Sequence, residues 1–276
     1  MSTTVYEIIT AQIIAHLEKG VVPWRQPWRS GLPKNLASGK VYRGINLFLL
    51  SILNEEYFVT RKQAEEQGGR IRCEGFPVVF WKMLERENPK SCEIDRIPFL
   101  RYYKVYPVSG VDGLAVPAAD TVPAAPIDAA DEVVRNMPNP PVIRYGGRGA
   151  CYFPSRDEVQ MPEIQNFTDS EEFYCTLFHE LAHSTGHQNR LSRVGVTTNW
   201  AFGSHEYSEE ELVAEMTASF LCGFSGIGQK TVSNSASYIG GWLKKLQADP
   251  RYIVKASSKA QRAADYILGH YNEDPG

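Results

Sequence analysis

One short sequence, His-Glu-Leu-Ala-His at residues 179–183, constrains this 276-residue chain more than any other feature. Residues four positions apart lie on the same face of an α-helix, so His179 and His183 can bind one metal ion together. Glu180 then lies beside the water molecule that such an ion activates, where its carboxylate can take a proton from that water. The pattern therefore predicts a metal site of hydrolytic type on a helix.

The residues around this pattern predict where the helix begins and ends. Asp169 and Glu172 have the spacing of a helix start signal, in which side chains accept hydrogen bonds from exposed backbone N–H groups. Phe178 and Leu181 give the segment an apolar side, and Gly186 suits the residue that follows a helix. Unliganded histidines beside such apolar neighbours would be poorly satisfied, so the context favours a metal site over a surface helix.

Two histidines need at least a third protein ligand, with one position left open for water. A second helix is expected at 208–221, and Glu215 lies in it among apolar residues, where a lone carboxylate would be costly. We therefore expect Glu215 to be the third ligand. Glu211 is explained differently, as the partner of Ser208 in a capping box at the helix start. Three alternatives remain open: His187 as ligand, His205 as ligand, and a purely structural Glu215.

The expected ligands indicate the metal and the reaction. Two imidazoles and one carboxylate suit Zn2+ with an open coordination position, and Mn2+, Co2+ or Ni2+ can occupy the same set. Such a site is typical of a zinc-dependent metallopeptidase of the glutamate-ligand type, with Glu180 as its general base. His205 and Tyr207 precede the second helix in an expected loop and are candidates for stabilising an oxyanion. A structural or silent metal site is the alternative.

Cysteine usage and hydropathy limit the cellular compartments in which this chain is expected. The five cysteines are odd in number and show no Cys-x-x-Cys spacing, which argues for a reducing compartment and against disulfides or a zinc finger. The first residues lack the basic and apolar regions of a secretory signal. No uninterrupted apolar run reaches about 18 residues, so no membrane span is expected. Together these features predict a cytoplasmic protein.

Charge is divided unevenly along the chain, with 16 basic and 11 acidic residues in 1–106 against 13 and 21 in 107–276. The segment 19–54 is more strongly basic, with six Lys or Arg residues, no acidic residue and several aromatic rings. Basic groups for phosphates and flat rings for unstacked bases are what a single-stranded nucleic acid requires. The candidate DNA contacts are Trp24, Arg25, Trp28, Arg29, Lys34, Lys40, Tyr42 and Arg43. A solvated loop with two core tryptophans is the alternative.

The pattern of apolar residues, caps and breakers predicts an α+β protein of two domains. Residues 1–106 are expected to form a DNA-binding domain, and residues 127–276 a mainly helical domain that carries the metal site. The proline- and alanine-rich segment 107–126 is typical of a linker, and few contacts are expected to cross it. Beyond the two site helices, helices are expected at 4–19, 46–53, 60–67, 128–137, 231–247 and 251–271. Strands are expected at 75–82 and 99–106 around a polar loop at 85–96, and at 142–145 and 150–153 as a hairpin.

Several longer motifs occur together in this chain: Pro-Trp-Arg-Gln-Pro-Trp at 23–28, the segment 35–46, Leu-Arg-Tyr-Tyr-Lys-Val-Tyr at 100–106, the segment 176–187, and Glu-Glu-Leu-Val-Ala-Glu at 210–215. With them the sequence resembles the ArdC antirestriction family over almost its whole length. The resemblance implies an N-terminal domain that binds single-stranded DNA and a C-terminal zincin-like metallopeptidase domain. It places the family's metal and base positions at His179, Glu180, His183 and Glu215. It also implies protection of incoming plasmid DNA from restriction during conjugation, with a restriction-system protein as a candidate target.

Overall fold

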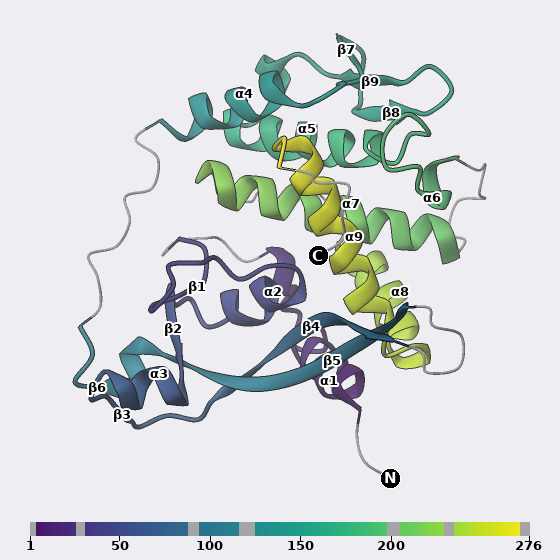
Figure 1. The fold of residues 1–276 in the computed structure, drawn as a ribbon. Coiled ribbons are helices and arrows are strands. Elements are labelled where there is room, and N and C mark those ends of the chain that lie inside the picture. Colours follow the sequence, from purple (N-terminus) through teal and green to yellow (C-terminus); the bar gives the residue numbers. More distant parts are fainter. Residues whose placement is uncertain are drawn as a thin grey trace.

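The structure, a computed structural model, describes residues 4–25, 31–87, 94–115, 125–197, 205–228 and 235–270. It has an α+β fold made of two domains, as the sequence predicts (Figure 1). The N-terminal domain, purple to blue in Figure 1, lies below and contains a sheet with a long hairpin. The C-terminal domain, teal to yellow, lies above and is mainly helical. The last long helix, α9 (Tyr252–Ile267), spans both domains.

Helix α1 (Val5–Leu17) begins where the sequence predicts. Thr4 accepts a hydrogen bond from the backbone N–H of Glu7, and the Glu7 carboxylate accepts one from the backbone N–H of Thr4, which together form a capping box. The buried stripe of this helix consists of Ile9, Ile13 and Leu17. The other helical elements of the domain are η1 (Pro23–Arg25), α2 (Ile45–Ser51), α3 (Arg61–Glu66) and η2 (Val108–Gly110).

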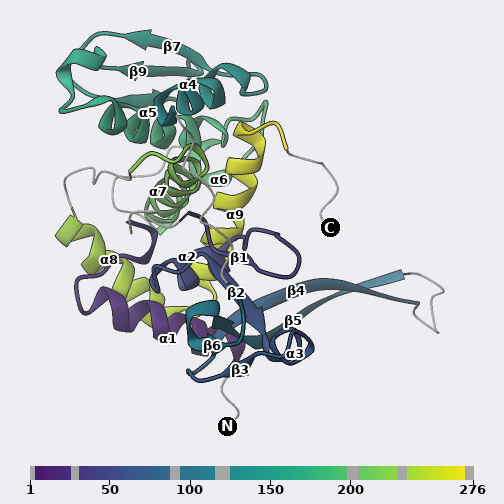
Figure 2. The ribbon, with the colours of Figure 1, turned by 90° about the vertical axis from the view of Figure 1, so that its left-hand side faces the viewer.

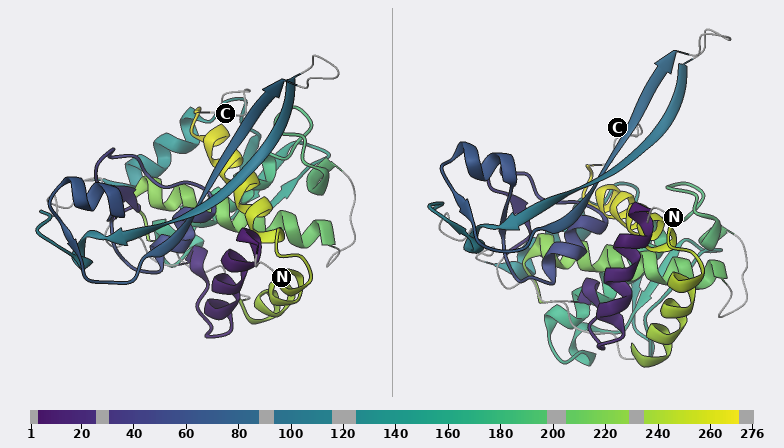
Figure 3. Two further views of the ribbon diagram at one scale, coloured as in Figure 1. Left: turned by 60° about the horizontal axis from the view of Figure 1, so that its bottom comes forward. Right: turned by 90° about the horizontal axis from the view of Figure 1, so that it is seen from below.

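A four-stranded sheet forms the centre of the N-terminal domain, in the order β1-β2-β5-β4. Its strands are β1 (Lys34–Asn35), β2 (Tyr57–Thr60), β4 (Phe76–Glu87) and β5 (Ile94–Pro107). A separate antiparallel pair joins β3 (Arg70–Ile71) to β6 (Val111–Asp112). The β4–β5 hairpin is much longer than its neighbours, and its far end projects well beyond the rest of the molecule (Figures 2 and 3).

The expected polar loop at 85–96 is wrong, because both of its ends continue the strands. The antiparallel register runs from Phe76 opposite Val105 to Glu87 opposite Ile94. Near the far end of this register, residues of opposite charge are paired, as Glu85 is with Arg96. Residues of opposite charge are favourable on neighbouring strands of a sheet as well as in a loop. Polarity alone therefore predicted the ends of the two strands at the wrong residues.

The C-terminal domain places a three-stranded sheet beside helix α5. The expected hairpin between 142–145 and 150–153 is wrong, because β9 (Glu158–Met161) lies between β7 (Val142–Tyr145) and β8 (Cys151–Phe153). Strand β9 contributes two fully buried side chains, which explains its central position. The helical elements are α4 (Pro126–Asn136), η3 (Ile164–Asn166), α5 (Ser170–Ser184), α6 (Val194–Thr197), α7 (His205–Ser225) and α8 (Ser235–Ala248), followed by α9. None of the helices in the described ranges is both long enough and apolar enough to cross a membrane.

The segment expected to be a linker, 107–126, is structured at both ends. Pro107 is the last residue of β5, Val108 and Val111 are buried, and β6 pairs with β3. Helix α4 begins at Pro126, where a proline suits the first helical turn. Residues 116–124 lie outside the described part of the chain. The ends of this segment therefore belong to the two domains that it connects.

The two domains share one apolar core, which corrects the expectation that few contacts cross between them. The largest cluster of buried side chains combines residues of α1, η1 and α2 with residues of α5, α7, α8 and α9. Trp24 of η1 is fully buried edge-on between Phe48 of α2 and Trp242 of α8, with ring centroids 6.4 and 5.2 Å away. Phe48 in turn stacks on Phe220 of α7 at 4.6 Å. The position of one domain is therefore fixed by packing against the other.

Candidate metal centre

Helix α5 carries the two expected histidine ligands and the expected base. Asp169 caps this helix by accepting a hydrogen bond from the backbone N–H of Glu172 at 3.0 Å, as the start signal predicts. His179 and His183 lie on one face of the helix, with their Nε2 atoms 3.1 Å apart. The Glu180 side chain is buried beside them. The sequence motif thus brings its three polar residues together as expected.

The carboxylate that joins the two histidines is Glu211, from helix α7. Its Oε2 lies 3.6 Å from His179 Nε2, and its Oε1 lies 3.5 Å from His183 Nε2. Within the described ranges, this is the one group of three His, Cys, Asp or Glu residues whose ligand atoms all lie within 4.8 Å of one another. Two imidazoles and a carboxylate that converge from two helices are a donor set that fits a divalent ion with an open position.

Glu215, the expected third ligand, is not part of this group. It forms a two-point ion pair with Arg25 of η1, in which Arg25 Nε donates to Glu215 Oε2 at 2.9 Å. The burial cost that pointed to a metal is therefore offset by an arginine from the other domain. The capping explanation of Glu211 is also wrong, because α7 begins at His205 and Ser208 lies inside the helix. The Glu211 carboxylate instead lies beside the two histidines.

The remaining candidates from the sequence have other positions. His187 Nδ1 lies 4.0 Å from Asp157 Oδ2 and is not part of the ligand group. His205 is the first residue of α7 and Tyr207 lies in its first turn, so neither is in the expected loop. The side chains of these two residues lie outside the described part of the structure, and their role as oxyanion donors stays a prediction.

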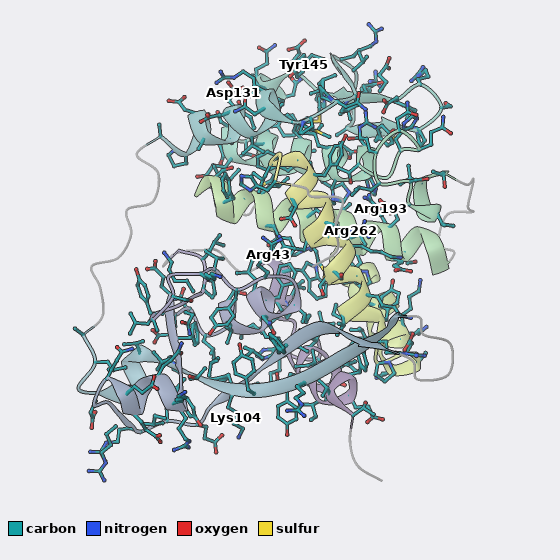
Figure 4. The ribbon with its side chains drawn as sticks, viewed as in Figure 1. Arg43, Lys104, Asp131, Tyr145, Arg193 and Arg262 are labelled. Atoms are coloured by element: carbon teal, nitrogen blue, oxygen red, sulfur yellow. The ribbon has the colours of Figure 1, made fainter. Side chains whose placement is uncertain are left out.

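Glu210 holds His183 from the side opposite the ligand group. Its Oε1 lies 3.3 Å from His183 Nδ1, and Arg193 donates to the same carboxylate from Nε at 2.9 Å. Arg193, labelled in the upper domain of Figure 4, also donates to the Ala182 carbonyl at 2.7 Å and so ties the end of α5 to α7. A carboxylate on the second ring nitrogen fixes the orientation of a metal-binding histidine. Sequence reasoning missed this contact, because no local pattern indicates where the loop with Arg193 packs.

Burial and neighbouring charges set different protonation states for the two histidines. Burial, with a contribution from His183, lowers the pKa of His179 to about 4, so its ring is neutral and able to bind a metal. Burial alone would also lower the pKa of His183, but hydrogen bonds to Glu210 and Glu211 raise it well above its ordinary value. A divalent ion bound at this site would therefore take the place of a proton on His183.

The expected base, Glu180, lies near the edge strand of the small sheet. Burial raises the pKa of its carboxyl, and a hydrogen bond from the backbone N–H of Tyr152 opposes part of that rise. Tyr152 belongs to β8, which lies at one edge of the sheet and runs beside α5. A raised pKa suits a group that must accept a proton near neutral pH.

The eight candidate DNA contacts from the basic segment do not form one surface. Trp24 is fully buried in the shared core, so its ring is not available to a base. Arg25 is buried in its ion pair with α7, and Lys34 is mostly buried and paired with a carboxylate. Two other candidates, Trp28 and Arg29, lie outside the described residues. A basic and aromatic composition could not distinguish core side chains from surface ones.

Three candidates lie at the surface of the N-terminal domain. Lys40 is exposed, and the half-buried Tyr42 has its pKa raised to about 12 by burial, with Tyr103 of β5 adding to the shift. The side chain of Arg43 is 61% exposed and forms an ion pair with Asp265 of α9 at the boundary of the two domains (Figure 4).

A second aromatic and basic surface, not anticipated from the sequence, lies on the β4–β5 hairpin. Phe80 and Tyr103 are 47% and 40% exposed, and Phe80 is opposite an exposed Arg101 in the register. Alternate residues of a strand and directly opposed residues share a face, so Phe80, Arg101 and Tyr103 form one hairpin face. Tyr102 and Lys104 are exposed on the other face (Figure 4). The run Arg-Tyr-Tyr-Lys within the predicted strand was the signal for this surface.

Comparison with known proteins agrees with the division into two domains. Residues 3–106 match the N-terminal domain of anti-restriction factor ArdC, and residues 128–259 match a family of zincin-like metallopeptidases. Fold and site therefore define a zincin-like metallopeptidase domain joined to an ArdC-type N-terminal domain, with a site for a divalent metal. The chain belongs to the ArdC antirestriction family, as its relatives show.

Similar proteins extend over nearly the whole chain. The metal-free crystal structure of the antirestriction protein ArdC from plasmid R388 is 32% identical, with a TM-score of 0.80, and the match covers 98% of this chain and 100% of that one. The Mn(II)-bound structure of the same protein is 34% identical, with a TM-score of 0.79 and coverage of 97% and 98%. The uncharacterized protein y4eC of Sinorhizobium fredii is 34% identical over 96% of this chain and 92% of its own length. The DNA primase TraC of Escherichia coli is 30% identical, but the match spans only 20% of its length.

Proposed function

We propose that this protein is a plasmid antirestriction factor that binds single-stranded DNA and hydrolyses a protein target at its metal centre, so that incoming DNA is protected during conjugation. The observation that carries the proposal is the group His179, His183 and Glu211 with Glu180 beside it, in a chain whose other domain is of the ArdC type. The R388 relative, which is named for antirestriction, supports this role, and the TraC relatives, which are named as DNA primases, support a DNA partner. The candidate target is a protein of the recipient's restriction system.

Each residue of the centre has a distinct chemical task. When held by His179, His183 and Glu211, a divalent ion supplies Lewis acidity, which activates water and polarises a scissile carbonyl. Glu180 accepts the proton released during attack on the peptide bond and passes it to the leaving amine. Zn2+ is the expected ion, and Mn2+ fits the same ligands.

The DNA-binding part of the proposal is assigned to the hairpin face rather than to the basic segment 19–54. Phe80 and Tyr103 offer exposed rings on which unstacked bases can lie, and Arg101 adds positive charge on the same face. Tyr42, half-buried and edge-on to Phe58, and the exposed Lys40 remain further candidates on the surface of this domain. A duplex keeps its bases stacked and cannot use such rings, so we expect preference for single strands. Affinity should fall as salt rises, because phosphate contacts release counterions.

Replacing Tyr103 with alanine is expected to weaken binding of single-stranded DNA by about 1–3 kcal/mol, because a stacked base loses its aromatic partner. Tyr102→Ala is the matched control, since Tyr102 is the next residue of the same strand, is 46% exposed and lies on the opposite face. Fluorescence anisotropy with a labelled oligonucleotide of mixed sequence, at one fixed salt concentration, measures both variants. Equal losses for the two variants contradict the assignment to the hairpin face.

Glu180→Gln tests whether hydrolysis is needed for protection. Glutamine cannot accept the proton, but it can still accept the hydrogen bond from Tyr152, and no ligand or hairpin-face residue is changed. We therefore expect the variant to keep its metal and its DNA affinity, and to lose protection of an incoming plasmid. The measurement is the ratio of conjugation into a restricting recipient to conjugation into a restriction-deficient one.

The same assay separates the proposal from a non-enzymatic alternative. In that alternative the protein protects DNA by coating the single strand, and the metal site is structural or silent. Full protection by Glu180→Gln, together with loss of protection by Tyr103→Ala, supports coating and contradicts the peptidase role. If Glu180→Gln fails while its DNA affinity and metal content are unchanged, hydrolysis is required.

A further inference from the structure

Two buried cysteines contact each other across the helix pair that carries the metal ligands. Cys175 of α5 and Cys222 of α7 are 4% and 0% exposed, and their Sγ atoms lie 3.1 Å apart. They are 47 residues apart in the chain, so tertiary packing alone creates this contact. Because a disulfide bond is about 2.05 Å long, the two sulfur atoms need to approach by only about 1 Å to form one.

The cysteine pair lies on the same helix seam as the metal ligands. Cys175 precedes His179 by four residues and therefore lies on the same face of α5, about one turn away. Cys222 follows Glu211 by eleven residues, about three helical turns, which places it on the ligand-bearing face of α7. A covalent link at this point would join the two helices whose relative position brings Glu211 to the histidines.

We propose that Cys175 and Cys222 are a redox modification site, at which hydrogen peroxide forms a reversible disulfide. In the first step the sulfur of Cys175 attacks one peroxide oxygen, the O–O bond breaks, and a sulfenic acid and one water form. In the second step the sulfur of Cys222 attacks the sulfenic sulfur, the S–S bond forms, and a second water leaves. Two thiols and one peroxide thus give one disulfide and two waters, with sulfur oxidised and peroxide reduced.

The burial of the two cysteines determines which oxidant can react and which cysteine reacts first. Cys222 is completely enclosed, and burial raises the pKa of its thiol well above the ordinary value, so it does not react first. Cys175 keeps a small exposed area and lies 3.5 Å from the carbonyl of Gly228, near the end of α7. Hydrogen peroxide is small, whereas a bulky disulfide such as oxidised glutathione cannot approach a sulfur that is this enclosed. The reaction is therefore slow and restricted to small peroxides.

The disulfide has a defined effect on the ligand-bearing helices. It closes a long loop in the unfolded chain and so lowers the entropy of the unfolded state. The midpoint of thermal unfolding is expected to rise by roughly 5–10 °C. Removal of the metal by a chelator is expected to be slower, because α5 and α7 can no longer separate at this end. Neither effect requires peptide hydrolysis, so this inference is independent of the proposed function.

The test uses the metal-loaded, full-length protein. It is treated with hydrogen peroxide, unreacted thiols are blocked after denaturation, and cross-linked peptides are identified by mass spectrometry. We expect one peptide pair that joins Cys175 to Cys222 and that dithiothreitol separates. Cys151→Ala, which removes an exposed cysteine, is the matched control and should form the same link. Cys222→Ala should form no link and should leave a sulfenic acid at Cys175.

Two outcomes overturn the proposal. One is that the folded protein forms no link between Cys175 and Cys222 although its exposed Cys151 has been oxidised. A link that forms only after denaturation counts as the same negative result. The other is a link that forms but leaves both the unfolding midpoint and the rate of chelation unchanged, which removes its stabilising role. The decisive mass measurement is made on the wild-type chain, so instability of a core variant cannot mask the result.

Discussion

Replacing Glu211 with alanine is expected to abolish metal binding, whereas replacing Glu215, one helical turn further along α7, is expected to leave about one divalent ion per chain. The reason is the position of the carboxylates. Glu211 lies 3.5 and 3.6 Å from the two histidine Nε2 atoms, and Glu215 is held by Arg25. Two histidines alone leave the ion short of the three protein ligands that such sites use. Metal content after equilibrium dialysis against Zn2+ and Mn2+ measures the difference.

The two variants need a common control for stability. Glu215→Ala removes the ion pair that Arg25 makes with Glu215 in a buried position, which is expected to cost about 3–5 kcal/mol of the free energy of unfolding. Metal content is therefore determined on the folded fraction, and Glu215→Gln, which keeps hydrogen-bonding atoms for Arg25, is measured beside it. Chelation of the wild type should lower the unfolding midpoint, because a metal bound only to the folded state stabilises it by mass action. Retention of metal by Glu211→Ala with loss in Glu215→Gln would reverse the ligand assignment.

The part of the site that could be predicted from the sequence is the part set by local geometry. A four-residue spacing on one helix places His179, Glu180 and His183 whatever the rest of the fold does. The choice between Glu211 and Glu215 is different, because both lie on the same face of α7 and both are mostly buried. That choice depends on Arg25, which is 190 residues away in the chain and belongs to the other domain. No local pattern could have indicated that contact.

The same distinction explains the errors in the fold. Helices α1 and α5 were predicted because their caps are encoded within a few residues, at Thr4 and at Asp169. The pairing of β7 with β9 was missed, because the partner of a strand is chosen by packing rather than by nearness in sequence. The exposed rings of the β4–β5 hairpin were not anticipated, and Trp24, a candidate DNA contact, is buried, for a related reason. Aromatic residues suit a core and a nucleic-acid surface equally, and only tertiary structure decides between them.

Trp24→Ala is expected to lower the free energy of unfolding by about 3–5 kcal/mol, as large-to-small changes of fully buried aromatic residues do. Trp24 is 0% exposed and lies between Phe48 of the N-terminal domain and Trp242 of the C-terminal domain. The loss of stability therefore falls on the contact between the domains and not on the exposed hairpin face. Denaturant unfolding followed by both fluorescence and circular dichroism measures it, with Tyr102→Ala as an exposed aromatic control that should change stability by less than about 0.5 kcal/mol.

The number of unfolding transitions tests whether the two domains share one core. Because one apolar core contains side chains of α1, η1 and α2 together with those of α5, α7, α8 and α9, wild-type unfolding should be a single transition seen identically by both probes. Trp24→Ala should shift this transition without splitting it, and DNA affinity of the folded protein should be unchanged, since Trp24 cannot reach a base. Two separate transitions in the wild type, or lost DNA affinity at full folding in Trp24→Ala, would contradict the shared core. A single transition means that the two domains unfold as one cooperative unit, as packing around one shared core requires.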